Sequence, residues 1–372
     1  MENSEKTRAD DDANWRISEI RAAIDDIDEK LLELLNKRLG LALTAGRAKA
    51  QKGAQVLDNT RENAILQRVS ALNKGPLTQN SLRQIFKQIM AASRELQRAH
   101  RVTYLGPEAT FTHIAAMNHF GESVSFIPQS NIREVFREVE KGACHYGVVP
   151  IENSIEGSVN STLDLFFESN LKICAEKYQP ISHDLLSVTG NLEDIRVIYS
   201  HPQAFAQCRL WLQKYVPNAA LEECSSTAHA AQKASELPGT AAIASNEASH
   251  MYNLEILASG IEDVARNTTR FLVIGKEPVH RTGNDKTSVM FVTSHIPGAL
   301  YHSLKPMADS GVNMVKLESR PTKHENWSYF FFADVEGHME DAIVKETVEK
   351  MKEICLYVKW LGSYPKVEES EK

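Results

Sequence analysis

Residues 15–49, WRISEIRAAIDDIDEKLLELLNKRLGLALTAGRAK, have the pattern of one long amphipathic helix. Apolar side chains recur there every three or four residues, which places them on one face. That apolar stripe consists of Ile17, Ile20, Ile24, Ile27, Leu31, Leu34, Leu41 and Ala45. Arg38 falls inside the stripe, and Lys49 extends it by one further turn. Because burying an unpaired charge is costly, both cations need partners on neighbouring helices or in a bound ligand.

Two further helical patterns follow, near 58–72 and over 81–99. Polar side chains continue the apolar face of each, Asp58 and Glu62 in the first and Ser93 and Gln97 in the second. Inside a helical core, the two cations could pair with the two carboxylates as salt bridges, or reach outward into solvent. Taken together, the six polar residues favour a ligand site, because helical bundles build such sites from side chains on facing helices.

Arg21 lies at the edge of the same stripe, well before Arg38 in the helix. At ~1.5 Å per residue the two are about 25 Å apart along the axis, and each side chain reaches only about 6 Å. Two arginines of one chain therefore cannot both bind one small molecule. If both serve one ligand, Arg21 comes from a second chain, and the sequence predicts a dimer.

The composition narrows the class of protein. The chain has 372 residues and a net charge of −7, and its length suffices for two or three domains. Its first hundred residues carry 17 Lys and Arg against 14 Asp and Glu, which suits a small anionic ligand better than nucleic acid. Five scattered cysteines indicate a reducing, cytoplasmic location rather than disulfides or a zinc site. Apolar runs are too short to predict a membrane span.

The pattern of apolar and polar residues changes at Val102. From there to about 280, short apolar runs alternate with amphipathic segments, which indicates an α/β domain of one or two lobes. The predicted strands are 102–105, 124–127, 146–151, 197–199, 241–244 and 271–274, and the clearest helical segments are 131–141 and 202–215.

A polar linker at 280–287 separates this segment from the last one. Strands are predicted at 288–293, 312–318, 329–336 and 357–362, and helices at 299–309 and 339–355. The resulting βαββαβ order is the ferredoxin-like one, which by itself says little about function.

Polar loops adjoin four predicted strands of the middle segment, at the edge where open α/β sheets bind ligands. They are 106–110 (GPEAT), 150–154 (PIENS), 200–203 (SHPQ) and 267–271 (NTTRF). Each loop alone has the residue types of an ordinary turn. That the four loops meet in one cleft is therefore an expectation from the fold class. The sequence has no H-E-x-x-H, Walker, G-x-S-x-G or G-x-G-x-x-G motif, so we expect no metal and no cofactor. Chemistry would then rest on hydrogen bonding, acid catalysis and positioning.

Over residues 12–365 the chain resembles the bacterial bifunctional chorismate mutase/prephenate dehydratases. The first segment is similar to an all-helical chorismate mutase through Arg21, Arg38, Lys49, Asp58, Arg61, Glu62, Ser93 and Gln97. The middle resembles a prephenate dehydratase through Gly106-Pro107, Pro150-Ile151-Glu152-Asn153, Ser200-His201-Pro202-Gln203 and Thr269-Arg270-Phe271. The end resembles an ACT regulatory domain through Gly298-Ala299-Leu300 and Glu318-Ser319-Arg320-Pro321.

The resemblance implies three domains behind a short disordered leader. An all-α mutase would span 12–100, an α/β dehydratase 101–280, and an α+β ferredoxin-like ACT domain 286–365. The dehydratase would have two lobes, like a periplasmic binding protein.

The helical segment would rearrange chorismate to prephenate, a reaction that needs a compact substrate conformer and charge stabilisation but no nucleophile. The implied roles are carboxylate binding by Arg38 and a second chain's Arg21, donation to the ether oxygen by Lys49 and Gln97, and hydroxyl binding by Asp58 and Glu62, supported by Ser93 and Arg61. The fork geometry of arginine matches a carboxylate well.

The middle segment would convert prephenate to phenylpyruvate with loss of carbon dioxide and hydroxide, and the resemblance implies Thr269 as the acid for the departing hydroxyl. The other implied substrate ligands are Asn153 and Gln203 for positioning, Arg270 for a carboxylate, and Thr110 and Glu152. The chain departs from the family at Ala109, where glycine is usual, which puts the backbone of that loop in question.

The last segment would bind phenylalanine between two chains and inhibit the dehydratase. The implied effector ligands are Gly298, Ala299, Leu300, Asn313, Glu318, Ser319 and Arg320. The expected partners are thus chorismate, prephenate, L-phenylalanine and further copies of the chain, but neither nucleic acid nor a membrane. Two dimerising segments, the mutase and the ACT domain, could build a dimer or a tetramer. Two alternatives stay open, a non-catalytic amino-acid sensor and an enzyme with one inactive half.

Overall fold

The computed structural model describes residues 2–51, 59–97, 101–121, 124–321 and 329–367. By its internal contacts the chain forms two compact units. Unit 1 comprises residues 1–57 and 66–99, and unit 2 comprises residues 58–65 and 100–372. Within the described ranges, no helix combines the length and the apolar content that crossing a bilayer requires.

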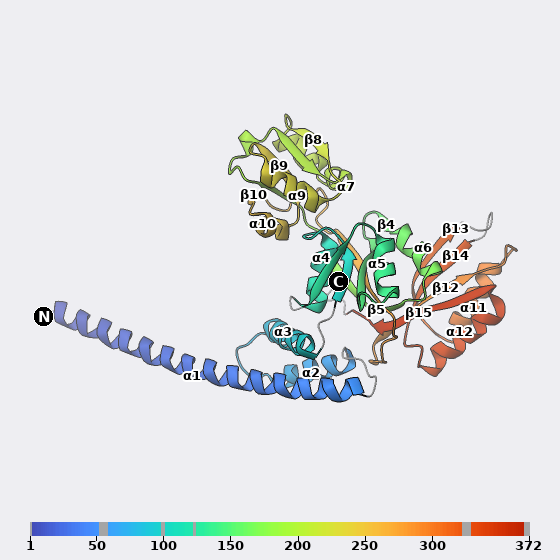
Figure 1. Ribbon diagram of the computed structural model, residues 1–372, viewed down its shortest axis with the longest axis horizontal. Helices are drawn as coiled ribbons and strands as arrows, with labels where there is room; N and C mark the ends of the chain where they lie inside the picture. Colours follow the sequence, from blue (N-terminus) through green and yellow to red (C-terminus); the bar gives the residue numbers. More distant parts are fainter. Residues whose placement is uncertain (1, 52–58, 98–100, 122–123, 322–328, 368–372) are drawn as a thin grey trace. The chain divides into compact units, whose positions relative to one another are not determined.

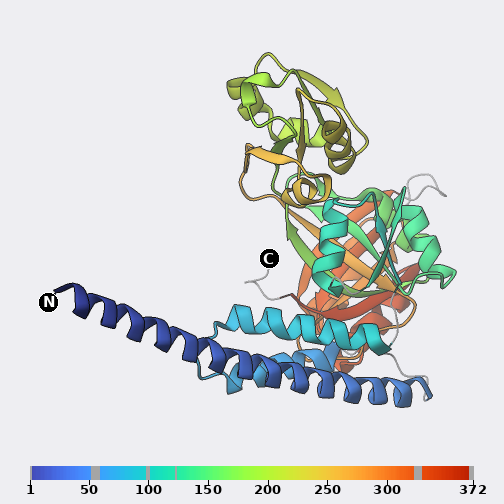
Figure 2. The ribbon, with the colours of Figure 1, turned by 60° about the vertical axis from the view of Figure 1, so that its left-hand side comes forward.

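Unit 1 is helical, as predicted. Helix α1 (Glu2–Gln51) is one uninterrupted helix, dark blue in Figure 1 and Figure 2. It packs against α3 (Gln79–Gln97), and the C-terminal half of α2 (Asn59–Leu72) belongs to the same unit. The expected disordered leader is instead the first part of α1. It contains neither Pro nor Gly and carries several strong helix formers, so the helix extends through it.

The apolar stripe of α1 faces solvent in the single chain. Ile20 is 59% exposed and Leu41 67%, and at least half of the surface is exposed in Ile24, Ile27, Leu31 and Leu34. This stripe is therefore not buried within the single chain. A contiguous exposed apolar surface of this kind marks an interaction site.

Unit 2 begins with a lobe built on a mixed sheet of order β2-β1-β3-β11-β5, with the short β4 paired to β3. β1, β2 and β3 run parallel, and β11 runs antiparallel between β3 and β5. The strands are β1 (Arg101–Leu105), β2 (Ser125–Gln129), β3 (Tyr146–Asn153), β4 (Gly157–Ser158), β5 (Lys172–Pro180) and β11 (Thr268–Gly275). The helices of this lobe are α4 (Phe111–Phe120), α5 (Ile132–Glu140) and α6 (Asn160–Glu168).

A second lobe, yellow-green in Figure 1, has its own sheet of order β10-β6-β9-β7-β8. Its strands are β6 (Asp184–Ser187), β7 (Val197–Ser200), β8 (Ala220–Glu223), β9 (Thr240–Ala244) and β10 (Glu255–Ala258). Its helices are η1 (Leu192–Asp194), α7 (Pro202–Gln207), α8 (Arg209–Tyr215), α9 (Thr227–Glu236) and α10 (Asn246–Tyr252). The chain enters after β5 and returns before β11, and these two crossings are joined where Ile181 N donates to the Asn267 carbonyl at 2.8 Å.

The last part of unit 2 has the predicted order of strands and helices. An antiparallel sheet of order β13-β14-β12-β15 carries two helices. Its elements are β12 (Asp285–Val292), α11 (Ala299–Asp309), β13 (Met314–Pro321), β14 (Tyr329–Glu336), α12 (Ala342–Ile354) and β15 (Tyr357–Pro365). We call these four strands the C-terminal sheet.

The C-terminal sheet shares a hydrophobic core with the first lobe. Met290, Phe332 and Leu361 pack in one buried cluster with Val149 and Ile173. A Cβ on Gly362 would lie 2.3 Å from the Ile173 carbonyl oxygen, so only glycine lets β15 approach β5 this closely. The sheet is thus a fixed neighbour of the strands that carry the PIEN and TRF motifs.

Candidate active sites

The first candidate site joins α1 to α3. Arg38 Nη1 donates a hydrogen bond of 2.6 Å to Ser93 Oγ, and that hydroxyl donates onward to the Ile89 carbonyl at 2.8 Å. Ser93 is buried, with 6% of its surface exposed. A guanidinium has five N–H donors, so Ser93 can fix the direction of Arg38 while other donors remain for a ligand carboxylate.

The other predicted mutase residues are placed only in part. Arg21 is exposed on α1, and because α1 is continuous, its separation from Arg38 of about 25 Å stands. In α2, Arg61 is exposed and Glu62 is half-buried. The side chains of Lys49 and Gln97, and the whole of Asp58, lie outside the described residues.

The second candidate site lies where β3 meets β11. Their antiparallel register sets Asn153 opposite Thr269. Asn153 Nδ2 donates to Thr269 Oγ1 at 2.9 Å and to Asn267 Oδ1 at 2.7 Å. All three side chains are buried. The strand register therefore brings two of the predicted dehydratase residues into direct contact.

Backbone groups fix the direction of these hydrogen bonds. The amides of Ile155 and Glu156 donate to Asn153 Oδ1 at 3.0 and 3.1 Å. A backbone N–H can only donate, so the carboxamide oxygen faces the turn and the nitrogen faces Thr269. Thr269 Oγ1 accepts from Asn153, which leaves its own proton to be donated elsewhere.

The orientation of the Asn267 carboxamide is fixed in the same way, and this side chain contacts the second lobe. Its oxygen accepts from Asn153, so its nitrogen donates, to Gln207 Oε1 at 3.1 Å. His183 Nε2 lies 2.9 Å from the same oxygen and must therefore carry the ring proton. Burial lowers the pKa of His183, which keeps the imidazole neutral. One directed network thus connects Thr269 to both lobes.

Gln207, rather than Gln203, enters this network. Gln203 lies one turn earlier in α7, half-buried, where its backbone amide donates to the capping ring of His201 at 3.3 Å. The spacing of four residues places both glutamines on one helix face, but the sequence does not choose between them. Asn267 belongs to one of the polar loops expected near a cleft, but the sequence assigns no role to it or to His183.

Three predicted substrate ligands make contacts of their own within the protein. The Thr110 hydroxyl caps α4 and accepts from His113 N at 3.3 Å. Arg270 follows Thr269 in a strand, so it points to the opposite face, where its Nη1 is 2.7 Å from Asp334. Glu152 occupies the matching position in β3 and pairs with Lys316 at 2.6 Å. Strand alternation thus turns Arg270 and Glu152 to the face of the strand pair opposite Thr269 and Asn153.

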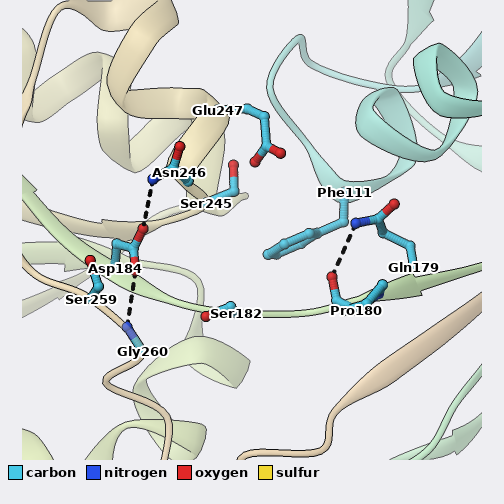
Figure 3. Close-up of a pocket in the computed structure, with 10 residues that line it drawn as sticks. All are labelled: Phe111, Gln179, Pro180, Ser182, Asp184, Ser245, Asn246, Glu247, Ser259 and Gly260. Carbon is cyan, nitrogen blue, oxygen red and sulfur yellow. Dashed lines mark hydrogen bonds between the residues drawn. The ribbon is translucent and has the colours of Figure 1, made fainter. Parts of the chain in front are cut away.

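A pocket of about 530 Å³ lies between the two lobes (Figure 3). Its lining residues are Phe111, Gln179, Pro180, Ser182, Asp184, Ser245, Asn246, Glu247, Ser259 and Gly260. The charged groups in this set, Asp184 and Glu247, are both acidic. A dianionic substrate would be repelled by them, so the pocket is a poor place for its carboxylates. The Asn153–Thr269 pair is the better candidate for the chemistry.

The predicted effector residues lie around the start of α11 and on or just before β13. Gly298 precedes α11 with φ 79°, and Ala299 and Leu300 form the first turn of that helix. On β13, Glu318 and Arg320 share the half-buried face, and Arg320 lies 3.8 Å from Asp164 of α6. Asn313 donates to Glu336 at 3.0 Å.

Comparison with known proteins defines a chain with one mutase and one dehydratase domain. Residues 20–98 match the family model of chorismate mutase type II, and residues 102–279 match that of prephenate dehydratase. The bifunctional chorismate mutase/prephenate dehydratase of Aquifex aeolicus (strain VF5) is 45% identical over 354 residues, 94% of this chain and 98% of its own. The chain belongs to the bifunctional chorismate mutase/prephenate dehydratase family.

Solved structures match nearly three quarters of the chain. A prephenate dehydratase from Arthrobacter aurescens in complex with L-Phe is 36% identical, with a TM-score of 0.67, and the match covers 72% of this chain and 90% of that one. A protein described as a novel type of quorum quenching acylase, GqqA, is 28% identical, with a TM-score of 0.66 and coverage of 72% and 98%. One fold thus serves different activities, so the assignment here rests on the full-length relatives and on the residues of the sites.

Proposed function

We propose that the chain performs two consecutive steps of phenylalanine biosynthesis, chorismate to prephenate and then prephenate to phenylpyruvate. Membership of a bifunctional enzyme family over almost the whole length supports both activities. The observation that carries the second is the buried contact of 2.9 Å between Asn153 and Thr269, which leaves a hydroxyl proton to donate. A non-catalytic sensor gives no reason for such an arrangement.

The mutase step needs charge matching rather than bond-making groups. Arg38, oriented by Ser93, binds one substrate carboxylate, and Lys49 with Gln97 stabilises the charge that develops on the ether oxygen. The hydroxyl is bound by Asp58 and Glu62, with Arg61 in support.

A second copy of the chain completes the mutase site. The exposed stripe of α1 supplies an apolar surface for a partner helix, and Arg21 is too far along α1 to reach a ligand at Arg38 of its own chain. Pairing of two such stripes would bury both and bring the partner's Arg21 within reach. The proposed unit is thus at least a dimer.

The dehydratase step is an acid-assisted elimination. As the ring carboxylate leaves as carbon dioxide, its bonding electrons move into the ring, and the hydroxyl departs at the opposite carbon. Thr269 donates its proton to that hydroxyl, which leaves as water, and solvent returns the proton. A threonine hydroxyl is a weak acid, so proton transfer is concerted with loss of carbon dioxide. Asn153 Nδ2 stabilises the negative charge that develops on Oγ1.

Feedback inhibition belongs to the C-terminal sheet and its helices. Their βαββαβ order and the strand order β13-β14-β12-β15 support a ferredoxin-like ACT domain. L-phenylalanine is the proposed effector, supported by the similar dehydratase whose structure contains L-Phe. The effector residues are Gly298, Ala299, Leu300, Asn313, Glu318, Ser319 and Arg320, and inhibition is a shift between two states of different effector affinity.

Two substitutions separate the two activities. Purified protein given chorismate alone should form phenylpyruvate. Arg38→Ala should lower the mutase kcat/KM by about 10²–10³, the cost of losing one charged donor, and leave dehydration of supplied prephenate intact. Thr269→Val should lower dehydration by about 10²–10⁴ and let prephenate accumulate. A fully active Thr269→Val, or loss of both activities in Arg38→Ala, would overturn the assignment.

A further inference from the structure

The strand pair β3–β11 carries different chemistry on its two faces. On one face Asn153 and Thr269 form the dehydratase pair. The next positions in the same register, Glu152 and Arg270, also lie opposite each other and point the other way. Both of these side chains form ion pairs with residues of the C-terminal sheet. The pair that does the chemistry is therefore one peptide unit away from two contacts with the regulatory part of the chain.

Arg270 is held by carboxylates from two different sheets. Its Nε and Nη2 lie 2.9 and 2.8 Å from Glu176 on β5, and its Nη1 lies 2.7 Å from Asp334 on β14. Lys286 on β12 pairs with both oxygens of Glu176 at 2.9 Å. All four residues are at most 4% exposed. Two buried cations balance two buried carboxylates, so a change at any one of them leaves a charge uncompensated.

Hydroxyl groups orient the Asp334 end of this cluster. Tyr364 OH accepts from Arg270 Nη2 at 3.0 Å, and Ser288 Oγ donates to Asp334 Oδ1 at 2.5 Å. Ser288 Oγ has one proton, so the bond of 2.7 Å between the two hydroxyls is donated by Tyr364. Burial raises the pKa of Tyr364 well above its ordinary value and keeps that proton in place. Strands β12, β14 and β15 therefore all fix the position of Arg270.

Glu152 forms a second bridge to the C-terminal sheet, in which its own side chain is 39% exposed. Its carboxylate lies 2.6 Å from Lys316 Nζ, and the Lys316 side chain is only 10% exposed. Lys316 is two residues before Glu318 on β13, the strand that also carries the ESRP motif. The bridge thus connects the residue beside Asn153 to the strand of the proposed effector site.

We propose that Arg270 and Glu152 are positioning residues for dehydration, through which the C-terminal sheet holds Thr269 and Asn153 in contact. The inference rests on the dehydratase function proposed for that pair. Neither side chain touches substrate. A small shift of β13 or β14 would move Glu152 or Arg270, which are the chain neighbours of Asn153 and Thr269. Effector binding at the C-terminal sheet or its helices would therefore alter the contact between Asn153 and Thr269.

The test uses the full-length protein and substitutions on the regulatory side of each bridge. Lys316→Gln removes the charge opposite Glu152, and Asp334→Asn removes the charge opposite Arg270 while keeping its shape. Dehydration kcat should fall about 2- to 30-fold, the range for coupling through residues that contact no ligand. The KM for prephenate should change less than about twofold, and the concentration of phenylalanine for half-inhibition should shift, because positioning rather than binding is altered.

Matched controls separate this route from general destabilisation. Lys316→Arg keeps the bridge and should restore kcat, whereas Lys350→Gln, an exposed lysine on α12, should behave like the parent. The mutase activity of each variant reports on the integrity of the rest of the chain. Parent kcat together with parent inhibition in both Lys316→Gln and Asp334→Asn overturns the inference, and so does an equal loss in Lys350→Gln. The Thr269→Val variant tests the underlying function separately, since full activity there would remove the dehydratase assignment whatever Lys316 does.

Discussion

The proposed mutase and dehydratase sites differ in how much of each site one chain supplies. On α1, the apolar stripe is exposed and Arg21 lies too far from Arg38 to share its ligand. Between β3 and β11, Asn153 and Thr269 are buried, in contact, and linked to both lobes within the same chain. A single helix displays its side chains along a line, so a compact site on it requires other helices. Strand pairing places residues distant in sequence side by side without a second chain.

The largest effect is expected when two mutase variants are co-expressed. Arg21→Ala and Arg38→Ala should each have little mutase activity, but co-expression should restore part of it, because a mixed dimer contains one site with both arginines intact. Statistical mixing makes half of the dimers mixed, with one good site of two, so about a quarter of the parent activity should return. Dehydration should be unaffected throughout. No recovery on co-expression would place Arg21 and Arg38 in the same chain's site or remove Arg21 from it.

A pair of glutamine variants sharpens the claim that one chain completes the dehydratase site. Gln207→Leu should lower dehydration kcat by about 10²-fold, since loss of its oxygen releases Asn267 and His183 and misplaces Asn153. Gln203→Leu, one turn away on the same helix, is the matched control and should cost much less. Steady-state kinetics with prephenate measures both. A larger loss in Gln203→Leu would exclude the network as the site.

The sequence predicts local periodicity well and spatial assembly poorly. The spacing of apolar residues predicts the helices of unit 1 and the elements of the C-terminal sheet, because this spacing depends only on residues close together in the sequence. The sequence of strand β5, KICAEKYQP, does not predict a strand because it contains Glu176 and two lysines. The cations that pair with Glu176 lie on β11 and β12, far away in the sequence. Strands β8 and β10 are not predicted because each has only four residues and lies at a sheet edge, where most of its side chains gain little burial.

The same limit applies to the sites. Asn153 and Thr269 could be named from their motifs, but the opposite directions of Thr269 and Arg270 depend on which face of β11 meets the C-terminal sheet. The choice of Gln207 over Gln203 depends on how α7 is placed against the crossing segment at Asn267. Both are tertiary facts, and no local pattern in the chain encodes them.

Acid should weaken the dehydratase part selectively. Burial lowers the pKa values of His183 and His113, so the unfolded chain binds these protons more readily than the folded one. The free energy of unfolding should therefore decrease as the pH falls below about 6.5, the ordinary histidine value. The first 99 residues contain no histidine, so mutase activity should be less affected. His183→Gln, which keeps an N–H donor but does not titrate, should reduce the decrease seen in urea unfolding between pH 7.5 and 5.5; an unchanged decrease would contradict this.

The smallest effect is expected at Ala109, which bears on how the two lobes of the dehydratase meet. Ala109 has φ 61°, and its carbonyl accepts from Ser245 Oγ of the second lobe at 3.3 Å. The loop therefore keeps a conformation suited to glycine while carrying a Cβ, at a cost of roughly 1–2 kcal/mol. Glycine would lose about 0.5–1 kcal/mol in backbone entropy, so Ala109→Gly should stabilise unit 2 by only about 0.5 kcal/mol. Asn253, with φ 53° at the end of α10, is the matched control, because asparagine tolerates this region and Asn253→Gly should change the urea midpoint less. If Ala109→Gly instead destabilises the protein, the methyl group's packing in the buried cluster around it outweighs the strain, and the departure from glycine is itself part of what holds the lobes together.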